Sequence, residues 1–164
     1  MKELMQVRDA VISVLNSVGV PALAAFPASR AKQYSGAVAA VAVGAAEGKA
    51  LGFCNYLGEV YDSEAGTVRE LYGKQLECVI TVDIRAERAA DCEKACGTAA
   101  EVLLGGLPSG IRPGELTWEA LCWEKETGMF LRRGGLQCRA VFTAREQEDR
   151  AMFLDFILRG VMTN

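Results

Sequence analysis

The residues of this chain with the most obvious capacity for chemistry are its six cysteines, since thiolates bind metal ions and act as nucleophiles. Cys92 and Cys96 are four positions apart, which on a helix places both thiols on one face. Four more cysteines could complete a thiolate zinc site: Cys54, Cys78, Cys122 and Cys138. Structural zinc sites usually take their ligands from closely spaced pairs, whereas the other cysteines here alternate with apolar residues. We therefore expect the cysteines to be small core residues and not metal ligands.

Other patterns that could support catalysis are weak. Histidine is absent, which removes the usual general base and the orienting member of a nucleophilic triad. Acidic clusters such as "GEVYDSE" and "REQEDR" fall in expected loops, where carboxylates are normally solvated. The Gly-Gly pairs do not open a helix, so they present no cradle for a phosphate. We expect no enzyme activity, no catalytic residue, no cofactor and no metal.

Composition predicts one folded domain over residues 1–164. The 164 residues include 51% hydrophobic residues, enough for one continuous core, and the net charge of −3 disfavours a nucleic-acid-binding protein. The N-terminus "MKELMQVRDAVISVL" interleaves charged and apolar residues, so it lacks the apolar region of a secretory signal. No apolar run approaches the length of a membrane span. The protein is expected to remain in the compartment where it is made, without sequence-specific nucleic acid or membrane partners.

The clearest element is a strand over residues 75–85, in which apolar residues occupy every second position and face one side. A helix follows from about Glu87, with Cys92, Cys96 and Leu103 on its apolar stripe, and another helix is expected over residues 2–18. Residues 34–58 predict a hairpin with its turn at 46–49, and residues 59–73 predict a surface loop.

A second hairpin is expected over residues 114–144, with its turn at "KETG" and a bulge at Gly134 and Gly135. Its first strand places Trp118 and Cys122 in the core and Trp123 on the opposite face. The last residues, "EDRAMFLDFILRGVMTN", fit a helix or an edge strand, and we favour the helix. The order α-β-β-β-α-β-β plus a C-terminal segment predicts an α+β fold, with two helices on one face of an antiparallel or mixed sheet.

Several residues are candidates for contacts with other molecules. They are charged or aromatic residues of the polar loop, an aromatic residue on the wetter sheet face, an arginine pair, and apolar residues of a possible interaction tail at 150–164. The candidates are Tyr61, Asp62, Glu64, Arg69, Trp123, Arg132, Arg133, Phe153, Phe156, Ile157 and Val161.

The order of elements also resembles that of small tail proteins of tailed bacteriophages and prophages, nearest the tail terminator, or tail-completion, group. The segments that carry the resemblance are "YSGAVAAVAV", "GFCNYLG", "ELYGKQLECVITVDIRAE" leading into a helix, and "FLDFILRG". No residue-level signature is shared, so no binding residue is carried over.

The resemblance implies a structural protein that forms a ring, commonly a hexamer, on the end of the tail tube, stops its polymerisation and helps to join the head. Its partners would be other copies of itself, the tail tube protein and a head-completion protein. It would be found in the bacterial cytoplasm during assembly and then in the virion tail. One alternative is another phage neck, minor capsid or connector protein. An alternative of a different class is a small α+β enzyme or ligand-binding domain.

Overall fold

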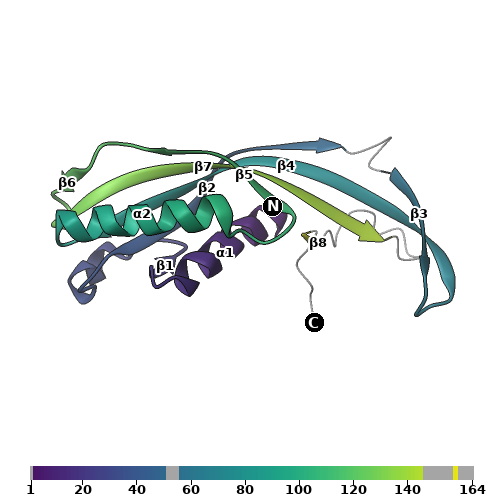
Figure 1. The fold of residues 1–164 in the computed structure, drawn as a ribbon, viewed down its shortest axis with the longest axis horizontal. Coiled ribbons are helices and arrows are strands. Elements are labelled where there is room, and N and C mark those ends of the chain that lie inside the picture. The colour runs from purple at the N-terminus through teal and green to yellow at the C-terminus, as the bar shows by residue number, and fades with distance from the viewer. Residues whose placement is uncertain (1, 51–55, 146–156, 159–164) are drawn as a thin grey trace.

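The computed structural model describes residues 2–50, 56–145 and 157–158 (Figure 1). These residues form a mixed sheet of eight strands in the order β1-β2-β4-β7-β5, with β3 beside β4 and with β6 and β8 beside β7. The helices are α1 (Lys2–Ser17), the short 3₁₀ helix η1 (Ala28–Gln33) and α2 (Ala89–Gly105). The strands are β1 (Ala22–Leu23), β2 (Val38–Ala50), β3 (Tyr56–Asp62), β4 (Thr67–Ala86), β5 (Ile111–Trp118), β6 (Cys122–Glu124), β7 (Met129–Arg145) and β8 (Ile157–Leu158).

Both long helices lie under the same face of the sheet, which confirms the predicted α+β fold (Figure 1). Helix α1 buries Val7, Val11 and Leu15, which recur every four residues and so form one apolar stripe. Helix α2 buries Cys92 and Leu103 on an equivalent stripe. It ends where the amide of Gly106 donates to the carbonyl of Val102 at 2.7 Å.

The centre of the sheet is the antiparallel pair β4–β7, and its helix-facing side is the core. The predicted alternation in β4 is confirmed, because Cys78, Ile80, Val82 and Ile84 are each at most 4% exposed. The facing residues of β7 are also buried: Leu136, Cys138, Ala140 and Phe142. Burial of these side chains against the two helices is the main stabilising contribution.

The predicted turn at residues 46–49 is wrong, because β2 runs straight through this segment from Val38 to Ala50. Glycine in this strand marks close packing instead of a turn. A Cβ at Gly48 would lie 3.3 Å from Cδ2 of Leu76 on β4, and one at Gly44 would lie 3.1 Å from the carbonyl oxygen of Val79.

The predicted surface loop at residues 59–73 is also wrong, because it forms a β-hairpin. Strand β3 continues along the same edge of β4 that β2 occupies: Ala50 pairs with Lys74, and Tyr56 pairs with Tyr72. The hairpin turn lies at residues 63–66, and Gly66 takes the positive φ of 65° that the turn requires. We call residues 56–72 the arm, since in Figure 1 this end of the sheet extends beyond the helices.

The second hairpin differs from its prediction in two respects. Strand β5 ends at Trp118 and pairing resumes only at Cys122, so the alternation does not carry across the break and Cys122 is exposed instead of buried. The expected bulge at Gly134 and Gly135 is absent, because β7 pairs with β4 there without a shift. Gly134 instead leaves room for the half-buried ring of Trp118, whose Cζ3 would lie 2.5 Å from a Cβ at this position.

The C-terminal segment contributes a short edge strand. Ile157 and Leu158 pair antiparallel with Thr143 and Phe142 of β7, so the favoured helix is wrong for these two residues. In the part of the chain that the structure describes, no helix is long and apolar enough to cross a membrane.

Candidate interaction surfaces

The arm brings together four of the predicted interface residues. Tyr61, Asp62, Glu64 and Arg69 all lie near the hairpin turn. Asp62 stabilises the turn, because its carboxylate accepts hydrogen bonds from the amides of Glu64 and Ala65 at 3.0 and 3.2 Å. The same carboxylate forms an ion pair with Nε of Arg69 at 3.1 Å. Asp62 and Arg69 therefore shape the hairpin, while Tyr61 and Glu64 are exposed.

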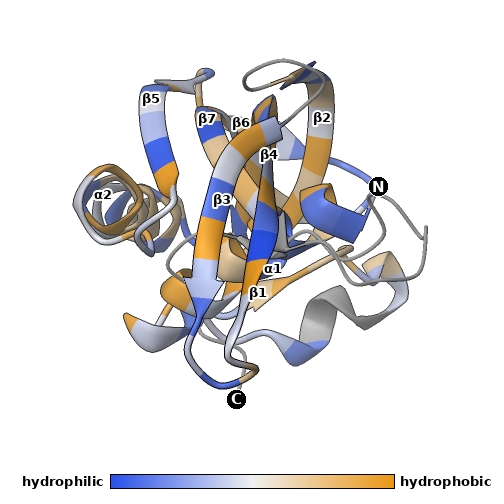
Figure 2. Ribbon diagram, turned by 90° about the vertical axis from the view of Figure 1, so that its right-hand side faces the viewer, coloured by the Kyte–Doolittle hydropathy of each residue, from blue (hydrophilic) through white to orange (hydrophobic). Residues whose placement is uncertain are grey.

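The arm also exposes apolar side chains. Tyr61 and Val68 are directly opposite each other on β3 and β4, and their side chains are 69% and 60% exposed. Figure 2 looks at the sheet from the arm end and shows apolar and polar residues interleaved on these two strands. Two opposed, exposed apolar side chains on a projecting hairpin make the arm a candidate contact surface, because a two-stranded hairpin has little core of its own.

The arm is acidic. Residues 56–72 contain Glu59, Asp62, Glu64 and Glu70 but only one basic residue, Arg69. The net charge of the arm is therefore −3, which is the same as the net charge of the whole chain. Glu59 and Glu70 are directly opposite each other across the two strands, and the carboxylate of Glu70 accepts a hydrogen bond from the hydroxyl of Tyr72 at 2.6 Å.

Trp123 is exposed, as expected. It lies on β6 with 56% of its surface accessible. Its ring packs edge to face against the ring of Phe130, with the two ring centres 5.0 Å apart. The predicted arginine pair is divided, because neighbouring residues of a strand point to opposite faces. Arg133 is opposite Asp83, whereas Arg132 is opposite the buried Ile84 and donates from Nε to a backbone carbonyl at 3.0 Å.

The remaining predicted interface residues belong to the C-terminal segment. Phe153, Phe156 and Val161 lie outside the described residues, and Ile157 is placed by its backbone pairing in β8. Their role as contact residues stays a prediction.

The face of the sheet that the helices leave uncovered carries a trough of about 580 Å³, which the sequence does not predict. It lies between two β-bulges, one in β2 between Val43 and Ala46 and one in β5 between Pro113 and Leu116. Each bulge adds one residue to an outer strand and bends it locally. The two bulged strands therefore form the two sides of the trough, and the central strands form its floor. The lining of the trough includes Val79, Glu77 and Arg139 on β4 and β7.

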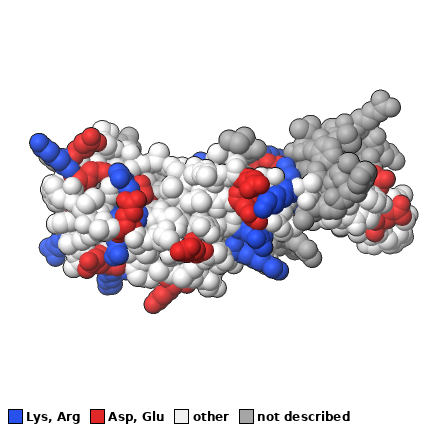
Figure 3. All heavy atoms as spheres, turned by 90° about the horizontal axis from the view of Figure 1, so that it is seen from above, with Lys and Arg blue, Asp and Glu red and all other residues white. Residues whose placement is uncertain are grey.

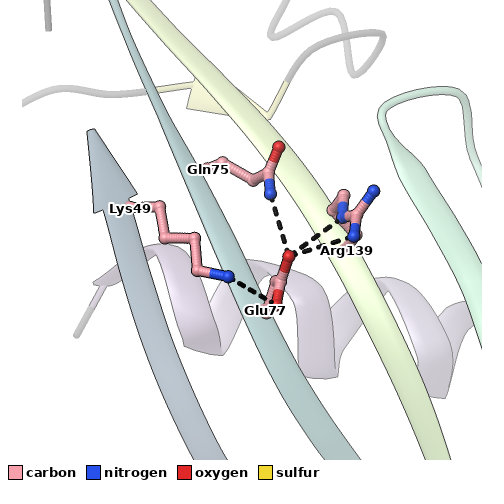
Figure 4. A network of polar contacts seen from close by, with 4 residues as sticks. All are labelled: Lys49, Gln75, Glu77 and Arg139. Atoms are coloured by element: carbon pink, nitrogen blue, oxygen red, sulfur yellow. Dashed lines mark hydrogen bonds and ion pairs between the residues drawn. The ribbon is translucent and has the colours of Figure 1, made fainter. Parts of the chain in front are cut away.

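Glu77 is the centre of a polar network at this trough (Figure 4). Its carboxylate accepts hydrogen bonds from Nζ of Lys49 at 3.1 Å, from Nε2 of Gln75 at 3.0 Å and from Nε of Arg139 at 3.1 Å. The hydrogen bond from Lys49, with the positive charges of Lys49 and Arg139, lowers the pKa of Glu77. The carboxylate is therefore ionised near neutral pH and fixes a basic residue on either side of it.

Arg112 completes the basic side of the trough. It lies on β5 directly opposite Arg139 on β7, and both side chains are exposed. Among the described residues, Arg139 is bound by Glu77 and no ion pair joins Arg112 to an acidic side chain. Arg112 is therefore the member of this pair suited to bind an incoming anion.

Seen from the helix-free side, charged side chains gather in separate groups with an uncharged stretch between them (Figure 3). Near β6, Arg85 forms a two-point ion pair with Glu124 at 2.8 and 3.1 Å, and its guanidinium lies 4.7 Å from the ring centre of Phe26. The hydrogen bond from Arg85 lowers the pKa of Glu124. Burial raises the pKa of the neighbouring Asp83, although Arg85 and Arg133 oppose this effect.

The described cysteines are free thiols, and all but Cys122 are buried. Cys92 donates to the carbonyl of Ile84 at 3.3 Å, and burial raises the pKa of Cys138 to about 12. No three or more histidine, cysteine, aspartate or glutamate side chains within the described ranges are grouped to hold a metal ion. Cys54 lies outside those ranges.

No protein-family model matches the chain, and no curated protein matches it either.

Proposed function

We propose that this protein is a structural component of a phage or prophage tail, which caps or completes the tail tube as a ring and contributes to joining the head. Its role is assembly and not catalysis. It is made in the bacterial cytoplasm and remains in the virion tail, in contact with copies of itself, the tail tube protein and a head-completion protein.

The observation that carries this proposal is the arm. A hairpin that extends beyond the helices and exposes Tyr61 and Val68 on opposed strands is suited to bind a neighbouring protein. Closed rings need such heterologous contacts, in which one surface of a subunit meets a different surface of the next. The long sheet with both helices on one face also agrees with the order of elements on which the resemblance to tail terminators rests.

The test is electron microscopy of particles released after prophage induction, from cells with and without this reading frame. Overlong or headless tails in the deletion strain would support a tail-completion role. Complementation with the intact gene should restore normal tails, whereas a gene lacking the arm turn should not. Normal particles in the deletion strain would refute the proposal. Loss of another neck structure, with tails of normal length, would favour a connector protein.

A second candidate is a small ligand-binding domain, which the trough favours. Its volume of about 580 Å³ is within the range of small-molecule sites, and it combines apolar residues with Glu77, Arg112 and Arg139. A thermal-shift screen of carboxylate and phosphate compounds tests this candidate. A stabilising compound should lose its effect in R112Q, and a screen without any stabilising compound argues against this function.

A further inference from the structure

We propose that the arm of one copy docks into the trough of a second copy, with Glu59 of the arm placed against Arg112 of the trough. This inference rests on the proposed ring and names the two surfaces that would build it. The occupant of the trough is therefore another copy of this chain.

The arm does not reach the trough of its own chain. Thr67 at the arm turn and Glu77 at the trough are ten residues apart on the uninterrupted strand β4, which corresponds to about 33 Å. Figure 1 shows that this end of the sheet curves toward the helix side, whereas the trough is on the helix-free face. Any contact between the two surfaces must therefore join different copies.

The trough lining includes Glu47 and Glu77 as well as Arg112 and Arg139, so the two surfaces are complementary at single residues and not in overall charge. Each carries a pair of like charges at directly opposed positions, Glu59 with Glu70 on the arm and Arg112 with Arg139 at the trough. Glu70 accepts a hydrogen bond from the hydroxyl of Tyr72, and Arg139 is bound by the carboxylate of Glu77. Glu59 and Arg112 form no ion pair among the described residues, so they are the members of the two pairs suited to attract each other. The arm carries a net charge of −3, and its exposed Glu59 is an acidic side chain suited to Arg112.

The apolar residues of the arm and the trough also match each other. Tyr61 and Val68 lie next to the acidic pair on the arm and need cover from water. The trough offers Val79 on its floor and Ala45 and Pro113 on its walls. An interface with an apolar centre and charged residues around it is the usual arrangement in stable complexes.

The geometry of this contact determines the assembly. The arm and the trough are different surfaces, so the contact is heterologous and each copy offers one of each to its neighbours. Copies joined in this way form a ring when the rotation closes. A two-fold dimer in which both contacts form at once is a different arrangement, and the stoichiometry distinguishes them.

The test uses two charge reversals on the full chain, Glu59→Lys on the arm and Arg112→Glu at the trough. Sedimentation velocity and native mass spectrometry would measure assembly of the unaltered protein, of each variant, of their equimolar mixture and of the double variant. Each single variant should assemble about tenfold more weakly than the unaltered protein. The mixture should assemble again with the variants in equal numbers, because the reversed arm then meets the reversed trough. The double variant should also recover.

Matched controls are Glu93→Lys and Lys94→Glu, which make the same charge changes on exposed positions of α2. They should leave assembly unchanged, and circular dichroism should show that all variants are folded.

If the unaltered protein assembles and neither reversal weakens it, the docking is refuted while the ring remains. If only R112E weakens assembly, the trough binds another segment and the arm is refuted as its occupant. If the mixture does not recover, the direct pairing is refuted. If the unaltered protein is monomeric at all concentrations, both the ring and the docking are refuted.

Discussion

Gly134 and its neighbour Gly135 allow a sharp test of how the sheet packs. Both lie in β7 and pair with β4 without a shift, yet their surroundings differ. A Cβ at Gly134 would lie 2.5 Å from Cζ3 and 2.6 Å from Cε3 of Trp118, closer than carbon atoms approach in proteins. A Cβ at Gly135 would have its nearest neighbour, Oγ1 of Thr117, at an ordinary 3.5 Å.

We expect Gly134→Ala to lower the free energy of unfolding by about 1–3 kcal/mol, the usual penalty for overpacking, because the Trp118 ring is rigid and half-buried. Gly135→Ala should raise it by about 0.5–1 kcal/mol, since alanine loses less backbone entropy on folding. The corresponding change in melting temperature is about 2–4 °C for each kcal/mol in a chain of this size.

The assay is urea denaturation followed by circular dichroism, combined with Trp118→Ala in a double-mutant cycle. In the Trp118→Ala background, Gly134→Ala should no longer be destabilising, because the atoms that it would strike are gone. Equal effects of the two glycine substitutions, or a penalty for Gly134→Ala that persists without the indole ring, would refute this explanation of the glycine.

Three further outcomes are expected. Asp62→Ala should increase hydrogen exchange of the arm amides about tenfold while leaving the β4–β7 core protected, because the turn loses its acceptor and Arg69 its partner; exchange that stays unchanged contradicts this role. Glu124→Gln should lower the melting temperature near pH 7, because the lowered pKa of Glu124 gives a stabilisation that is present above its ordinary value of 4.5 and lost as the pH falls through the folded-state value. Near pH 2 the difference from the unaltered protein should vanish, and a constant difference would point to packing. In a Cys54→Ala background, an aromatic disulfide reagent should modify only Cys122 rapidly under native conditions; fast reaction of a second thiol would contradict the burial of the others.

The central fold could be predicted from the sequence because burial leaves a periodic pattern. In β4, one face packs on the helices and the other remains polar, so apolar residues alternate from Leu76 to Ile84. The arm leaves no such pattern, since only Tyr72 at its base packs against the core and polar residues occur on both of its faces. The sequence of residues 59–73 therefore predicts a loop, and the structure has the hairpin turn at 63–66 instead of 46–49.

The trough could not be predicted, because it is made by two bulges in strands that lie apart in the sequence. Gly44 and the Pro113-Gly114 pair are the local signals, since glycine and proline in a strand often mark a bulge. Their relation becomes visible only once β2 and β5 lie on either side of β4 and β7. Likewise, Cys122 is exposed because the strand breaks after Trp118. The alternation of apolar residues in the sequence does not indicate this break.

The pairing of β4 with β7 also determines when the protein can fold. This pair joins Ala86 to Phe130 at one end and Leu71 to Arg145 at the other, so its contacts bridge long stretches of chain. The loop-closure entropy of such contacts is lost before they become favourable, which makes folding slow. The edge of β4 that pairs with β7 must therefore remain unpaired until β7 has left the ribosome, whereas its other edge can pair with β2 earlier. During this interval the unpaired edge exposes backbone amide and carbonyl groups, and an exposed strand edge of this kind favours aggregation of incompletely folded chains.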